Sequence, residues 1–159
     1  MATMKEAKDA ATTLKHFISK GQLKLMLSYC KGEEGEYFRN KLVEMAGVVD
    51  KMPATQEQDG LGDKAVAHLH YFVGNCDWWI TEKDAGAPDD GPDDGQLQAF
   101  GLASLGFEPE LGYISLQELF SVNAELDLHF KPITLGEVQK KFDSKCESSQ
   151  PVFSGAEVN

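Results

Sequence analysis

Cysteine is scarce in this chain of 159 residues, and the three cysteines form no CxxC pair. The wide spacing of Cys30, Cys76 and Cys146 excludes a disulfide framework and a zinc knuckle. Long hydrophobic runs are missing as well, since nowhere do eighteen apolar residues follow one another. The first segment, MATMKEAKDAATTLK, lacks the apolar core of a signal peptide. We therefore expect a reduced, cytoplasmic protein without a membrane partner.

The chain also has few positively charged residues. The chain has 15 Lys and Arg residues against 26 Asp and Glu residues, a net charge of −11. Residues 1–31 are basic, with six lysines and two acids, whereas residues 57–127 hold fifteen acids and two lysines, a local net charge of −13. Such a surface repels phosphate backbones, because affinity for nucleic acid depends on lysine and arginine that displace counterions. We predict no direct DNA binding by this half and attraction to a basic partner. The alternative is that the charge serves solubility alone.

The common catalytic signatures do not occur either. There is no phosphate-binding glycine loop, no HExxH and no GxSxG. The aspartate-rich string DDGPDDG lacks the alternating ligand positions and the distal glutamate of a calcium loop. We predict no catalytic residue and no cofactor, and a protein that is more readily a binding protein than an enzyme.

The first third of the chain has the apolar spacing of helices. Apolar residues recur at intervals of three and four from Met4 to Ile18, and Gly21 is expected to interrupt this helix. The spacing resumes at Leu23, Met26 and Leu27. After the turn at residues 32–35 it continues until Pro53, at Phe38, Leu42, Met45 and Val49.

The centre of the chain has the period of strands. Leu69, Tyr71 and Val73 alternate with His68, His70 and Phe72, and Gly74-Asn75 predicts a turn into a strand over residues 76–83. Further strands are expected over residues 97–104, 111–116 and 124–131, with a short helix over 116–121. The acidic segment 85–95 is expected to be a mobile loop. Thr134 and Glu137 form the pattern of a capping box at the start of a last helix.

These elements predict an α+β fold, in which N-terminal helices pack against an antiparallel sheet of about five strands and a C-terminal helix closes the domain. We expect a single domain over residues 1–143. Its helical part spans 1–52, its sheet part 63–132 and its closing helix 134–142. Residues 144–159 are expected to form a flexible tail.

Histidines and aspartates on the polar face of the predicted sheet are weak candidates for a metal site. His68 and His70 are two residues apart on one strand, so their rings project from the same face. With Asp127 or His129 from another strand they could supply three ligands. Histidines on a sheet face are more commonly solvated or hydrogen-bonded, so we predict no metal, and whether these residues converge is open.

Two adjacent tryptophans point to opposite faces of one strand, which places Trp78 in the core and Trp79 beside Asp77 on the polar face. A large ring there needs cover by the chain itself or by a partner. The candidate partner-binding residues combine Trp79 with the acidic groups of the sheet half. They are Asp77, Trp79, Asp84, Asp89, Asp90, Asp93, Asp94, Glu108 and Glu110.

Four strings, DWWITEKD, AFGLASLG, ELGYISLQEL and LDLHFKPITLGEV, resemble the domain-of-unknown-function family 2958 over residues 64–140. The resemblance implies a genomic setting on plasmids, conjugative elements and phages. It implies no activity and no catalytic residues.

Together, charge and resemblance lead to three functional hypotheses. The first is an accessory protein of a mobile element that binds and inhibits or modulates a host nucleic-acid-handling protein, such as a CRISPR or restriction nuclease, by electrostatic contact. The second is a metal-binding or hydrolytic factor of plasmid DNA metabolism that uses His68, His70, Asp127 and His129. The third is a structural module that associates with a larger conjugation protein through an apolar contact. The oligomeric state is left open.

Overall fold

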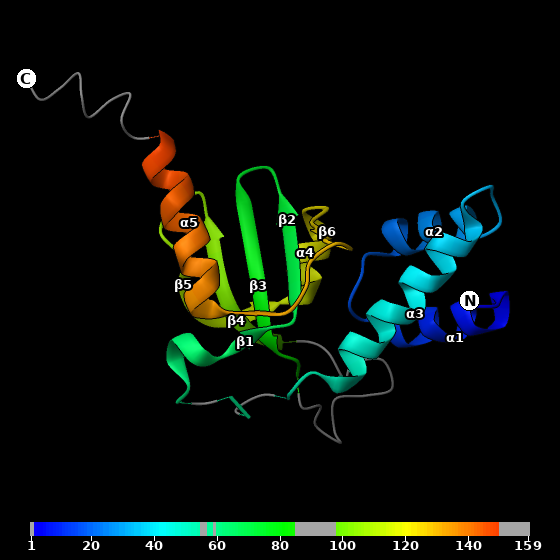
Figure 1. The fold of residues 1–159 in the computed structure, drawn as a ribbon, viewed down its shortest axis with the longest axis horizontal. Helices are drawn as coiled ribbons and strands as arrows, with labels where there is room; N and C mark the ends of the chain where they lie inside the picture. Colours follow the sequence, from blue (N-terminus) through cyan, green and yellow to red (C-terminus); the bar gives the residue numbers. More distant parts are fainter. Residues whose placement is uncertain (1, 55–56, 59, 85–97, 150–159) are drawn as a thin grey trace, which may run out of the picture.

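Helices and strands follow one another in the order that the sequence predicts. The computed structural model describes residues 2–54, 57–58, 60–84 and 98–149 (Figure 1). Three helices come first, a five-stranded antiparallel sheet follows, and a helix ends the described chain. The α+β fold is therefore confirmed. The predicted mobile loop with its four acidic residues, Asp89, Asp90, Asp93 and Asp94, lies outside the described residues, as does the end of the predicted tail.

The N-terminal helices are α1 (Met4–Leu14), α2 (Lys20–Tyr29) and α3 (Gly35–Lys51). Thr3 and Glu6 form a capping box at the start of α1. The predicted break at Gly21 is wrong, because α1 already ends at Leu14 and Gly21 lies in the first turn of α2. The Ser19 side chain accepts the Gln22 N–H and starts α2 two residues earlier.

The main sheet has the strand order β5-β4-β3-β2-β6. The hairpin of β2 (Leu69–Val73) and β3 (Cys76–Glu82) turns at Gly74, which has a positive φ. The strands β4 (Gln98–Leu105) and β5 (Glu110–Ser115) form the next antiparallel pair, and α4 (Leu116–Ser121) follows β5. The strand β5 thus lies at one end of the sheet, and β6 (Glu125–Leu126) lies at the other.

The predicted strand over residues 124–131 is wrong beyond Leu126. Only Glu125 and Leu126 pair with β2. The Asp127 carboxylate accepts the His129 N–H at 3.0 Å, and the Asp127 carbonyl accepts the Phe130 N–H at 3.4 Å. These local bonds turn the chain, because an aspartate side chain offers the backbone an alternative to the strand ladder.

The last helix, α5 (Leu135–Ser149), begins with the predicted capping box. The Glu137 N–H donates to the Thr134 hydroxyl at 3.2 Å, and the Thr134 N–H donates to the Glu137 carboxylate at 3.3 Å. The helix continues past the expected end at residue 142. A second, small sheet of β1 (Val66–Ala67) and β7 (Ile133–Thr134) joins the start of α5 to the residues before β2. The 3-10 turn η1 (Gly62–Lys64) precedes β1.

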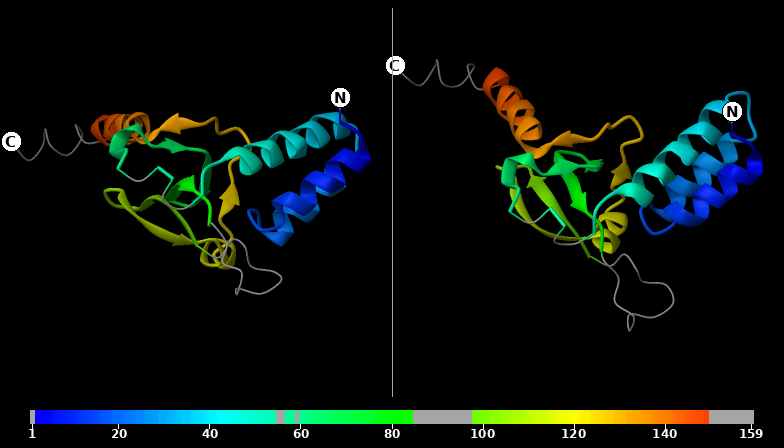
Figure 2. Two further views of the ribbon diagram at one scale, coloured as in Figure 1. Left: turned by 90° about the horizontal axis from the view of Figure 1, so that it is seen from below. Right: turned by 60° about the horizontal axis from the view of Figure 1, so that its bottom comes forward.

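The sheet buries apolar side chains on both faces. On one face, Leu69, Tyr71 and Ile80 join a large cluster with the N-terminal helices, and the Tyr71 hydroxyl donates to the Phe17 carbonyl. On the other face, Leu102 packs with Leu135 and Val138 of α5. Figure 2 shows the N-terminal helices and α5 at opposite ends of the sheet. Over the described residues, no helix has both the length and the apolar character needed to span a membrane.

Candidate functional site

The imidazole of His70 lies between two carboxylates on the face of the sheet that packs against α5. Its Nε2 is 2.8 Å from Oδ1 of Asp77, and its Nδ1 is 2.9 Å from Oδ2 of Asp127. All three side chains are mostly buried, with exposed fractions of 15%, 28% and 27%. With both carboxylates ionised, both contacts are hydrogen bonds only in the imidazolium form, in which each ring nitrogen carries a proton. We call His70, Asp77, Asp127 and Trp79 the His70 cluster.

Strand register and one local turn assemble this cluster. In the β2–β3 hairpin His70 is paired with Trp79, and Phe72 is paired with Asp77, so these four residues share one face. Asp127 follows β6, and its N–H donates to the His70 carbonyl at 2.8 Å. The turn after β6 thereby brings the Asp127 carboxylate to the second ring nitrogen.

Aromatic rings pack on both sides of His70. The His70 ring stacks on Trp79 with ring centres 5.4 Å apart and on Phe72 with ring centres 5.8 Å apart. Phe130 lies 5.5 Å from the same ring. Trp79 also packs against the cluster of Leu102 and α5. The chain itself thus covers most of Trp79, which leaves Phe72 as the more exposed ring of this face, 37% exposed.

The rings of the other predicted histidines make no hydrogen bond to the two carboxylates within the described residues. His68 directly precedes β2 and is half-buried, and this burial lowers the pKa of its imidazole. His129 is exposed, and its backbone N–H donates to the Asp127 carboxylate. Within the described parts of the chain, no three His, Cys, Asp or Glu side chains are placed to hold a metal ion. The structure therefore brings together His70 and Asp127 from the predicted ligand set and adds Asp77 in place of the other histidines.

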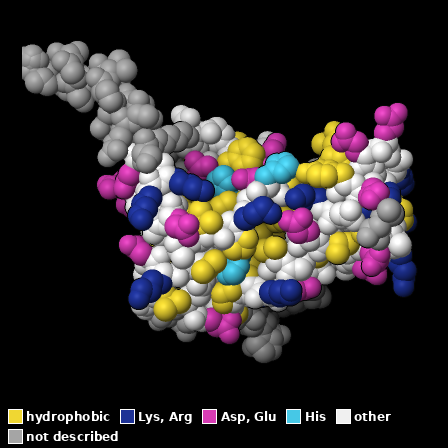
Figure 3. Space-filling view, in the orientation of Figure 1, with side chains coloured by type: hydrophobic (Ala, Val, Ile, Leu, Met, Phe, Trp, Pro, Cys, Tyr) yellow, Lys and Arg dark blue, Asp and Glu magenta, His cyan; other side chains and the backbone are white. Residues whose placement is uncertain are grey.

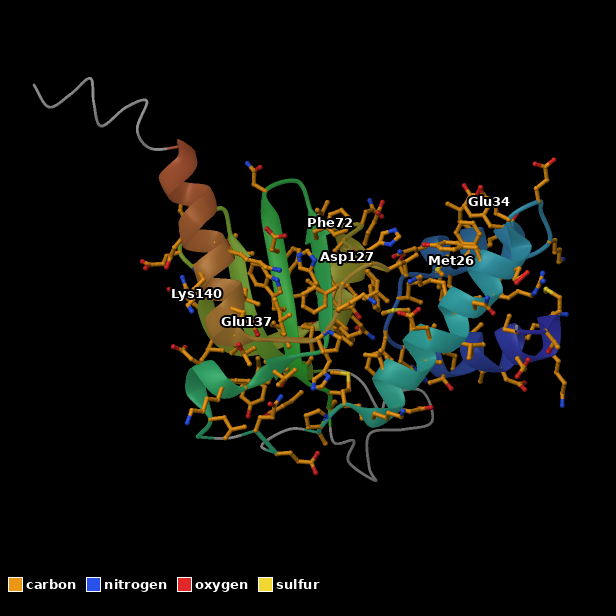
Figure 4. The ribbon with its side chains drawn as sticks, in the orientation of Figure 1. Met26, Glu34, Phe72, Asp127, Glu137 and Lys140 are labelled. Carbon is orange, nitrogen blue, oxygen red and sulfur yellow. The ribbon has the colours of Figure 1, made fainter. Side chains whose placement is uncertain are left out.

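A cleft of about 760 Å³ opens above the His70 cluster. Strands β2, β3 and β4 line it with residues that include Phe72 and Ser104, and α5 lines it with Lys141 and Phe142. We call it the Phe72 cleft. Figure 3 shows histidine, acidic and hydrophobic side chains close together on this face of the molecule, and Figure 4 places Phe72 and Asp127 side by side next to β2.

A second surface surrounds the outer strand β5 and carries two of the predicted partner-binding residues. Glu108 and Glu110 are exposed there, and large apolar side chains lie among them. Phe107 is 78% exposed and Tyr113 is 60% exposed. We call this surface the acidic edge, and its members are Leu105, Phe107, Glu108, Glu110, Leu111 and Tyr113.

Asp84 has a structural contact. Its carboxylate accepts the Gln98 N–H at 3.0 Å, which joins the end of β3 to the start of β4. Among the predicted partner-binding residues that the structure describes, the two glutamates of the acidic edge are thus the most open to a partner, whereas Asp77 is held by His70.

The sequence interpretation missed the apolar members of the acidic edge. Phe107 follows Gly106 in the turn between β4 and β5, and Gly106 has a positive φ. The exposure of Phe107 could have been predicted from its place in a glycine-containing turn, because turns lie on the surface and seldom bury a large side chain. Tyr113 and Leu111 belong to the strand predicted over residues 111–116, and their exposure follows from the position of that strand at the end of the sheet.

A family model, described as protein of unknown function (DUF2958), matches residues 40–140. The match begins inside α3 and includes the whole sheet, so it extends further toward the N-terminus than the resemblance at residues 64–140. No curated protein and no solved structure matches the chain. The family match covers more than half of the chain, and it includes the His70 cluster and the acidic edge. The chain belongs to the DUF2958 family.

Proposed function

We propose that this protein is a cytoplasmic accessory protein of a mobile genetic element that binds a host nucleic-acid-handling protein and inhibits or modulates it. A CRISPR or restriction nuclease is the class of partner. The single observation that carries the proposal is the acidic edge, where exposed apolar side chains and carboxylates share the surface around β5. The resemblance to a protein family encoded on plasmids, conjugative elements and phages implies that this protein is also encoded on such an element.

The apolar part of the acidic edge supports a protein partner. Phe107, Leu111 and Tyr113 are each more than half exposed. Contiguous exposed apolar side chains with a polar rim are typical of protein interaction sites. The strand β5 also ends the strand order, and the outer backbone groups of such a strand can bind an extended segment of a partner.

The charge of the acidic edge supports a basic partner. Glu108 and Glu110 line the same shallow pocket as the apolar side chains, and the chain as a whole has a net charge of −11. Proteins that bind nucleic acid carry lysine and arginine along the groove for the phosphate backbone. The negative potential of the acidic edge accelerates its encounter with such a groove. Once bound, the acidic edge competes with nucleic acid for the same basic side chains.

The test is direct binding to a purified CRISPR nuclease and a purified restriction nuclease at low and high salt. We expect wild-type protein to bind one of them at about 50 mM salt and to bind more weakly at about 300 mM, because salt screens charges across an interface. Replacing Glu108 and Glu110 together by lysine should weaken binding at low salt by at least about tenfold, or roughly 1.4 kcal/mol.

The matched control replaces Glu33 and Glu36 by lysine. Both residues are exposed near the start of α3, and the double replacement changes the net charge by the same amount away from the sheet. Equal losses in both double variants would show an effect of net charge alone and would overturn the role of the acidic edge. Binding that survives high salt would contradict the electrostatic mechanism and favour the apolar contact of a structural module.

A further inference from the structure

Phe72 lines the Phe72 cleft between carboxylates of two neighbouring strands. In the sheet register Phe72 is opposite Asp77 on β3 and opposite Glu125 on β6, so the three side chains share one face. The ring is 37% exposed, and Glu125 is exposed. The face of an aromatic ring attracts cations, and carboxylates at both sides add hydrogen-bond acceptors for the same cation.

His70 fixes the position of the nearer carboxylate. It binds Oδ1 of Asp77, and within the described residues Oδ2 accepts no hydrogen bond. In Asp127, by contrast, both carboxylate oxygens are occupied, one by His70 and the other by the His129 N–H. Asp77 therefore offers an oriented acceptor at the cleft, beside the exposed ring of Phe72.

The charges around the cleft favour a cationic ligand in either state of His70. Asp77, Asp127 and Glu125 contribute three negative charges, and Lys141 on α5 contributes one positive charge. With the imidazolium form of His70 the surroundings hold a net charge of −1, and with the neutral ring they hold −2. An anionic ligand is thus disfavoured, because the net negative charge of the surroundings would repel it.

We infer that the Phe72 cleft is a subsite for a guanidinium group, which stacks on Phe72 and donates hydrogen bonds to Asp77. A guanidinium group is planar, stacks on aromatic rings and presents its donors in a fork that matches a carboxylate, whereas an ammonium group is a compact point charge. The group belongs to an arginine side chain of the basic partner. This assignment to a partner rests on the proposed function.

The Phe72 cleft and the acidic edge lie close enough together for one partner to contact both. Gly106 lines the Phe72 cleft, and its neighbours Leu105 and Phe107 belong to the acidic edge. The Ser104 hydroxyl donates to the Phe107 carbonyl at 2.7 Å and holds the turn between the two surfaces. A partner seated on the acidic edge can therefore extend an arginine into the cleft.

The test is titration of the full chain with blocked arginine, N-acetyl-L-arginine amide, followed by the NMR signals of the Trp79 indole and the His70 ring. We expect saturable shifts with a dissociation constant on the order of 1 mM, typical of a ligand with few heavy atoms. Blocked lysine should bind at least about fivefold more weakly, because it can neither stack as a plane nor bind the carboxylate with two donors.

The variant Phe72→Leu keeps an apolar side chain but removes the ring face, and it should abolish the saturable shifts. Asp77→Asn should weaken binding of blocked arginine. The matched control is Phe107→Leu on the acidic edge, which should bind blocked arginine like wild type and should bind the nuclease more weakly. Unchanged shifts in Phe72→Leu, or equal affinity for blocked lysine, would overturn the guanidinium site and leave the test of the acidic edge intact.

Discussion

Gly101 on β4 and Gly112 on β5 are paired in the sheet, yet a side chain fits at only one of them. A Cβ atom on Gly101 would lie 2.0 Å from the Trp79 carbonyl oxygen, whereas a Cβ atom on Gly112 would meet no atom within 4 Å. We predict that Gly101→Ala lowers the free energy of unfolding by about 2 kcal/mol or more, because β3 and β4 must separate. The measurement is urea unfolding.

Gly112→Ala is the control for this prediction. It adds the same methyl group to the neighbouring strand, and its effect on the free energy of unfolding should stay below about 1 kcal/mol. Similar losses in the two variants would show that strand backbone entropy, and not the close approach of Gly101 to Trp79, explains the effect.

The contact of His70 with Asp77 should make a measurable contribution to stability. In a double-mutant cycle of His70→Ala and Asp77→Ala we expect a coupling free energy of about 1–3 kcal/mol, since the pair is charge-assisted and mostly buried. The pair of Lys41 and Glu44, 3.3 Å apart, serves as the comparison, because the Glu44 side chain is 50% exposed, and it should couple by less than about 1 kcal/mol. A coupling of zero for His70 and Asp77 would contradict the hydrogen bond.

Arg39 holds the N-terminal helices together. Its Nε donates to the Ala2 carbonyl at 2.9 Å, and its Nη1 donates to the Cys30 carbonyl at 2.8 Å. We predict that Arg39→Ala lowers the free energy of unfolding by about 1–3 kcal/mol, because two partly buried carbonyls lose their donors.

Two further variants separate the geometry of Arg39 from its charge. Arg39→Lys keeps the charge but cannot place two donors in one fixed plane, so it should also destabilise the protein. Lys41→Ala, two residues along α3, should change the free energy of unfolding by less than about 1 kcal/mol. Full stability of Arg39→Lys would show that charge alone is enough.

The burial of His68 leads us to predict a lower free energy of unfolding in acid. Burial lowers the pKa of His68 in the folded state, so the unfolded chain binds this proton more readily. The contribution of the neutral ring is therefore present above the unfolded pKa of about 6.5 and is lost as the pH falls below it. The free energy of unfolding of His68→Gln should fall less than that of wild type between about pH 7 and about pH 5. An equal fall in both proteins would contradict this role.

Much of the fold follows from local patterns. Alternation at Leu69 and Tyr71 fixes which face of β2 is buried, and both residues are fully buried in the structure. The capping box of Thr134 and Glu137 fixes the start of α5. These signals act within one element or one hairpin, where spacing alone determines geometry.

The site was harder to predict, because it depends on contacts between distant residues. Periodicity places His70 and Trp79 on the polar face, but it does not specify that the turn after β6 brings Asp127 to the ring, since 57 residues separate the two. The same turn shortens the predicted strand around His129, where a side-chain bond from Asp127 competes with the ladder. The exposure of Tyr113 depends on strand order, which local spacing does not determine.

The most direct test of the proposed function is DNA cleavage by the bound nuclease in the presence of increasing amounts of this protein. We predict that wild-type protein slows cleavage, that added non-specific DNA relieves the inhibition, and that replacing Glu108 and Glu110 by lysine raises the inhibitory concentration by at least about tenfold. The Glu33 and Glu36 double replacement should inhibit like wild type. Undiminished cleavage with wild-type protein, or equal inhibition by the Glu108 and Glu110 variant, would contradict the proposal.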